Sequence, residues 1–235
     1  MIDPMIEKHY DYTGYAYAYN NPIKFIDVMG LDTNVYVMDQ ASRPKDDGTS
    51  GTSYTAEIVV EVDGKAVGTY RGSSYPNSKS ESDNSTEHNT IDDGEHNYDN
   101  KYGHKGSSKK GLNIFDNAKT RETDGKSPDG KDSKMTGANV HSGHSDNGGN
   151  MSRGSTGCIT IHPDDVSSFM NNFDWSGTVT KRNTDGTVKT YTGTTGKSAG
   201  KVIVSRNGVS YDQYKAQENG ATYNPIRKVY IKNLF

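Results

Sequence analysis

The dipeptide Asp63-Gly64, set between two β-rich runs, is the local feature that most constrains the fold of this 235-residue chain. The first run covers residues 53–62 and the second covers 65–71. Asp-Gly between such runs favours a tight hairpin, because both central residues of the preferred turn need a positive φ. We therefore predict a β-hairpin here.

The rest of the pattern is also mainly β. Short β-branched runs predict strands at 35–38, 112–115, around Val140, and at 159–161, 178–181, 187–192, 201–205 and 229–232. Polar segments at 73–95 and 117–136 predict long loops. Pro163 begins a segment with apolar residues at 166, 169, 170 and 173, the spacing of one helix face. The predicted fold class is mostly β, with one or two short helices.

Composition excludes several classes of protein. Only 30% of residues are hydrophobic and the mean hydropathy is −0.93, but 16 tyrosines argue against a disordered chain. The net charge of −3 gives no basic face, so we expect no nucleic-acid partner. No apolar run approaches the roughly eighteen residues of a membrane helix, so we expect no membrane insertion.

The single cysteine, Cys158, excludes an intramolecular disulfide and a zinc site made of several thiolates. It follows Gly157 directly, and His141 and His144 lie upstream. A free thiol has a pKa of about 8.5, so a nearby imidazole is needed to make it a nucleophile at neutral pH. Glycine allows a sharp turn, and the N–H groups of Gly157 and Cys158 would stabilise an oxyanion. A buried, inert cysteine is the alternative.

This segment resembles the active-site signature of the L,D-transpeptidases, in which a histidine precedes Ser/Thr-His-Gly-Cys and an apolar residue. Ser155, Gly157, Cys158 and Ile159 match, and Thr156 departs from the pattern. Sixteen residues separate His141 from Cys158 and thirteen separate His144 from it; the first spacing fits better. Thr160 also departs, because the family usually has arginine or asparagine there.

The resemblance implies an L,D-transpeptidase-like β-sandwich or barrel that needs no cofactor and no metal. Cys158 would attack a peptidoglycan tetrapeptide stem, releasing D-alanine and forming a thioester, and His141 would act as base and then acid. Ser155, Gly157 and Ser142 are expected to support the oxyanion. His144 is expected as an alternative base or a substrate contact. Arg153 is expected either to meet an anionic substrate or to lie in solvent.

The first 31 residues resemble the carboxyl-terminal end of the core of Rhs/YD-repeat proteins, which precedes a toxin domain. The match runs through Tyr15 to Tyr17, Asn20 to Pro22 and Ile26 to Leu31, with Val28 in place of a proline. It implies that residues 1–31 end an Rhs core and that residues 32–235 are the toxin domain. The implied partners are an Rhs shell, a secretion machinery and a cognate immunity protein. No signal peptide is visible, so we expect an effector that is delivered to the periplasm or cell wall of a target bacterium.

Two other functions remain open. His141, His144 and Asp146 would suit a metal-dependent nuclease toxin. A non-catalytic module that binds the cell wall would also fit the composition. Of the five remaining histidines, His88, His96 and His104 lie in polar stretches and are expected to be solvated. His9 lies in the Rhs-like segment, and His162 is expected to end a strand or cap the following helix.

Overall fold

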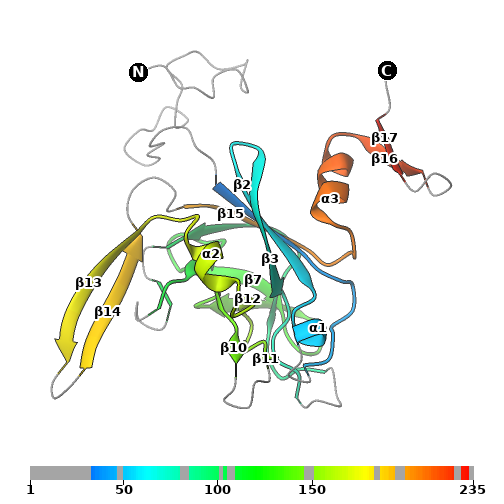
Figure 1. The fold of residues 1–235 in the computed structure, drawn as a ribbon. Helices are drawn as coiled ribbons and strands as arrows, with labels where there is room; N and C mark the ends of the chain where they lie inside the picture. Colours follow the sequence, from blue (N-terminus) through cyan, green and yellow to red (C-terminus); the bar gives the residue numbers. More distant parts are fainter. Residues whose placement is uncertain are drawn as a thin grey trace.

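Eight strands form a closed barrel in the order β1-β15-β5-β6-β9-β12-β3-β2. Their bounds are β1 Thr33–Met38, β15 Ala199–Ser205, β5 Gly94–Asp99, β6 Leu112–Phe115, β9 Asn139–Ser142, β12 Ile159–Ile161, β3 Lys65–Ser73 and β2 Ala56–Val62. Figure 1 shows the β2–β3 hairpin and strands β12 and β15 of this barrel. Neighbouring strands are antiparallel except β1–β15 and β9–β12, which are parallel. The barrel confirms the predicted mostly-β class.

The computed structural model describes residues 33–46, 50–79, 85–100, 103–104, 109–145, 151–182, 186–193, 199–224 and 229–232. The Rhs-like segment predicted at 1–31 lies outside these residues, and so does Asp146.

The predicted hairpin is confirmed. Strands β2 and β3 pair antiparallel on either side of the turn, where Asp63 has φ 52° and Gly64 has φ 71°. Two positive φ values are the signature of the turn whose twist matches that of the flanking strands. This hairpin closes the barrel, because β2 also pairs with β1 and β3 also pairs with β12.

Period-two alternation decides which side chains fill the barrel. In β1, Val35 and Val37 belong to the main core, whereas Tyr36 and Met38 face outward under helix α3 (Tyr211–Glu218). Most of the other core residues are apolar side chains of the barrel strands and of the segment around α2 (Val166–Met170), including Ile58, Val60, Tyr98, Leu112, Ile114, Val140, Ile159, Ile161, Val202, Val204, Phe169, Met170 and Phe173. The predicted apolar face at 166–173 is therefore confirmed.

Smaller elements surround the barrel. A three-stranded sheet contains β4 (Thr90–Ile91), β7 (Glu122–Lys126) and β8 (Asp132–Thr136). Two-stranded sheets pair β10 (His144–Ser145) with β11 (Met151–Ser152), β13 (Trp175–Arg182) with β14 (Gly186–Gly193), and β16 (Ala221–Asn224) with β17 (Val229–Lys232). Helix α1 covers Ser50–Ser53. Among the described residues, none of the helices has the length and apolar character needed to span a bilayer.

The loop predicted at 117–136 is wrong, because β7 and β8 form a hairpin there. Only Thr123, Gly125 and Met135 of this hairpin are buried, so its sequence is polar on both sides of each strand. The loop predicted at 73–95 is also partly wrong, since β4 and the first residues of β5 lie inside it. Helix α3 was not predicted, although Ser210 and Gln213 form a capping box at its start.

The pairing of β1 with β2 and β15 limits how far the chain can be shortened from its N-terminal end. A chain that begins at Asp32 keeps Thr33, which is fully buried, and keeps the pairing of β1 with both β2 and β15. We expect it to unfold cooperatively at the same urea midpoint as the full chain. A chain that begins at Asp39 lacks β1 and should not unfold cooperatively. Loss of the transition in the 32–235 chain would contradict this boundary.

Candidate active site

The two candidate catalytic residues come from the parallel pair β9 and β12. The register sets Val140 beside Ile159 and His141 beside Thr160. Val140 and Ile159 lie in the core, so their neighbours His141 and Cys158 belong to the outer face of the barrel wall. Extending the register by one residue sets Cys158 beside Asn139. His141 lies two residues beyond Asn139 on the neighbouring strand. The usual spacing between strands and rise per residue then put the Cα atoms of His141 and Cys158 about 8 Å apart.

His141 is held by a backbone carbonyl. Its side chain is 6% exposed, and its Nδ1 lies 2.7 Å from the carbonyl oxygen of Ser142. A carbonyl only accepts hydrogen bonds, so we assign the proton to Nδ1. This tautomer carries its lone pair on Nε2, which is the form a general base needs.

Cys158 is half-buried, and its Sγ lies 3.9 Å from the carbonyl oxygen of Gly137. Burial raises the pKa of the Cys158 thiol, and a hydrogen bond from the backbone of Asn139 only partly offsets this rise. The resting group is therefore a neutral thiol at pH 7. A nucleophilic role requires that a base remove its proton during attack.

Ser155 shapes the turn before the cysteine. Its hydroxyl donates to the carbonyl oxygen of Cys158 at 2.6 Å and accepts the N–H of Gly157 at 3.1 Å. Asn77 anchors the other side, because its N–H donates to the Ser155 carbonyl and its Oδ1 accepts the Ser155 N–H. The Gly157 N–H thus stabilises the turn in this structure. Its expected oxyanion role stays a prediction, together with that of the Cys158 N–H.

Glycine is the only residue type that fits position 157. Its φ is +131°, a conformation that side chains of L-residues rarely adopt. A Cβ there would lie 2.5 Å from Cε of Met135 and 2.9 Å from the carbonyl oxygen of Asn89. The turn therefore packs directly against the β4-β7-β8 sheet region.

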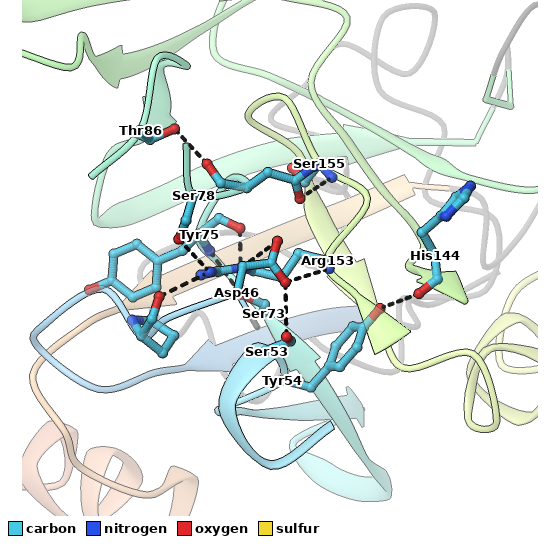
Figure 2. A network of polar contacts seen from close by, with 12 residues as sticks. Asp46, Ser53, Tyr54, Ser73, Tyr75, Ser78, Thr86, His144, Arg153 and Ser155 are labelled. Atoms are coloured by element: carbon cyan, nitrogen blue, oxygen red, sulfur yellow. Dashed lines mark hydrogen bonds and ion pairs between the residues drawn. The ribbon is translucent and has the colours of Figure 1, made fainter. Parts of the chain in front are cut away.

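Arg153 lies neither in solvent nor at a surface where it could meet an anionic substrate, so both expectations for it are wrong. Its side chain has no exposed surface, so it contacts neither solvent nor a substrate at the surface. The guanidinium donates to the Pro44 carbonyl at 2.9 Å and to Oγ of Ser78 at 3.0 Å, and it forms an ion pair with Asp46 (Figure 2). Asp46 also accepts the hydroxyl of Ser53. Arg153 therefore anchors the loop before the nucleophile from within the protein.

His144 begins the small β10–β11 sheet and is exposed. The hydroxyl of Tyr54 donates to its carbonyl oxygen at 3.4 Å, and Figure 2 shows its ring directed away from Tyr54. Ser142, at the end of β9, donates its hydroxyl to the carbonyl oxygen of Gly143. His144 is thus anchored through its carbonyl, and no hydrogen bond or ring contact holds its ring among the described residues, whereas the ring of His141 is fixed.

The metal-site alternative has no support among the described residues. No group of three or more His, Cys, Asp or Glu side chains there is arranged to hold a metal ion. Asp146, the third proposed ligand, lies outside the part of the chain that the structure describes.

Sequence reasoning missed one residue at this site. The ring of His104 stacks on that of His141, with centroids 4.0 Å apart and an angle of 7° between planes. His96 is not solvated either, because it is buried and its Nδ1 lies 2.9 Å from a carboxylate oxygen of Asp116. No periodic pattern surrounds His104 in the sequence, so no local signal distinguished it from a loop histidine.

Comparison of the chain with protein-family models, with curated proteins and with solved structures finds no match.

The positive φ of Gly157 and the close packing around it predict that adding one methyl group there, as in Gly157→Ala, lowers the stability of the fold strongly. Gly157→Ala should cost about 2–6 kcal/mol of stability, from backbone strain and overpacking against the backbone carbonyl of Asn89. Gly130→Ala is the matched control, because Gly130 also has a positive φ of 81° but open space around its Cβ position. It should cost only about 1–2 kcal/mol. Urea unfolding of both variants measures the difference, and equal losses would contradict the packing described for Gly157.

Proposed function

We propose that residues 32–235 act as a cysteine acyltransferase of the L,D-transpeptidase type on peptidoglycan stem peptides. The observation that carries this proposal is the parallel pairing of β9 with β12, which brings His141 and Cys158 to one face of adjacent strands. The contact of His141 Nδ1 with the Ser142 carbonyl supports the role of Nε2 as base. The signature around Cys158 supports the substrate class.

The proposed reaction has two halves. In the first, His141 Nε2 takes the thiol proton while the sulfur of Cys158 attacks the carbonyl carbon of the third stem residue. The tetrahedral oxyanion then collapses, the bond to D-alanine breaks, and its amine leaves with the proton from His141. In the second half, a nucleophile attacks the thioester. An amine gives a cross-link, water gives carboxypeptidation, and a free D-amino acid gives exchange.

Peptidoglycan lies outside the cytoplasm, so this activity requires delivery to the periplasm or cell wall of the target. The resemblance of residues 1–31 to an Rhs core supports delivery as the cargo of an Rhs shell through a secretion machinery. A producing cell would then need an immunity protein that blocks the site.

The neutral thiol and the fixed His141 ring predict different roles for the two histidines. Purified tetrapeptide muropeptides incubated with wild-type protein should lose D-alanine or exchange it, as read by mass spectrometry. Cys158→Ala should abolish turnover, and His141→Ala should lower it by about 10²–10⁴-fold, the usual contribution of a general base. His144→Ala, the matched control for loss of an imidazole, should keep most of the activity.

Other outcomes would overturn parts of this proposal. An inactive His144→Ala beside an active His141→Ala would move the base to residue 144. DNA degradation that a chelator abolishes and that Cys158→Ala leaves intact would favour the nuclease. Muropeptides that bind without a change in mass would favour a binding module.

A further inference from the structure

His104 and His141 are 37 positions apart in the sequence, yet their rings are in face-to-face contact. His104 lies in the connection between β5 and β6, whereas His141 lies on β9. The 7° angle between the ring planes means that one imidazole covers the face of the other. His141 is thus restrained in two ways, at its edge by the Ser142 carbonyl and on its face by His104.

Backbone hydrogen bonds hold His104 itself in place. His104 and Lys109 exchange two backbone hydrogen bonds, at 2.9 and 3.2 Å. The carbonyl of the preceding Gly103 accepts the side-chain amide of Asn113 at 2.7 Å. Gly111 has no side chain, and a Cβ there would lie 2.7 Å from the Cβ of His104. The absence of a side chain at Gly111 therefore leaves the space that His104 occupies.

Asn113 connects the segment that contains His104 to strand β9, which carries His141. Its Nδ2 carries two hydrogens, and besides Gly103 it donates to Oδ1 of Asn139 at 2.7 Å. Asn139 lies two positions before His141 on β9, and a hydrogen bond from its backbone acts on the sulfur of Cys158. One side-chain amide thus ties the loop of His104 to the strand that carries the base.

We propose that His104 is a positioning residue, whose ring holds the imidazole of His141 in the plane that directs Nε2 toward Cys158. This rests on the proposed function only in taking His141 as the base of Cys158. The ring torsion of a histidine is broad and has no sharp rotamer wells, so a single hydrogen bond at Nδ1 does not fix the plane. A base must lie within about 2.6–3.2 Å of the group whose proton it takes. The stacked ring restrains the plane of the imidazole directly.

The first test measures the reactivity of the thiol and needs no peptidoglycan. In alkylation by iodoacetamide the sulfur of Cys158 bonds to the CH2 carbon, iodide leaves, and the thiol proton passes to the base. At pH 7, His104→Ala should slow this reaction by at least about tenfold, since small misplacements of a catalytic group cost one to two orders of magnitude. His104→Phe keeps a flat ring and should restore the rate.

Control variants define the range of the measurement. His141→Ala sets the rate without a base. His88→Ala removes an imidazole from the segment before β4 and should leave the rate unchanged. Asn113→Ala should slow alkylation in the same direction as His104→Ala, because it releases the loop of His104 from β9. Urea midpoints of all variants show whether each one keeps the fold.

The second test uses muropeptide turnover. His104→Ala should lower kcat and leave KM unchanged, because His104 acts through His141 and not on the substrate. If folded His104→Ala alkylates and turns over like wild type, or if His104→Phe is as slow as His104→Ala, the positioning role is wrong. If wild type leaves muropeptides unchanged, the proposed function fails, but the alkylation series still decides the role of His104.

Discussion

The parallel pairing of β9 with β12 is the interaction on which the candidate site depends. Most of the barrel is antiparallel, and antiparallel neighbours can be joined by a short turn. A parallel neighbour needs a long crossover, which here runs from Gly143 to Cys158. The N–H of Gly143 still donates to the Ile161 carbonyl at 2.7 Å, so the pairing extends beyond the end of β9. The crossover therefore returns the chain with Cys158 directly before β12, on the face that carries His141.

A long polar crossover would be a poor scaffold for a nucleophile if it were held only at its ends. Arg153 changes this, because a fully buried guanidinium must keep its partners or bear a large desolvation cost. Its contacts with Asp46, Pro44 and Ser78 come from segments before β2 and after β3. Closer to Cys158, the two hydrogen bonds between Ser155 and Asn77 also link the crossover to the segment after β3. The barrel hairpin and the crossover thus hold each other in place.

The parts of the fold that the sequence predicted are those with strong local signals. Asp63-Gly64 identified the β2–β3 hairpin, and the apolar triplet at 159–161 identified β12 to the residue. The β7–β8 hairpin was missed, although Asp129-Gly130 lies at its turn, because its strands bury too few side chains to show alternation. His104 and the burial of Arg153 depend on contacts between distant segments, which local sequence patterns do not encode.

If the proposed mechanism holds, Cys158 forms a covalent acyl intermediate during turnover. Intact-protein mass spectrometry detects it after tetrapeptide muropeptide is mixed with the protein and the reaction is quenched with acid. We expect an added mass equal to the stem without its D-alanine, located on the peptide that contains Cys158 and released by hydroxylamine. An adduct that persists in Cys158→Ala, or turnover with no adduct at any time point, would contradict this mechanism.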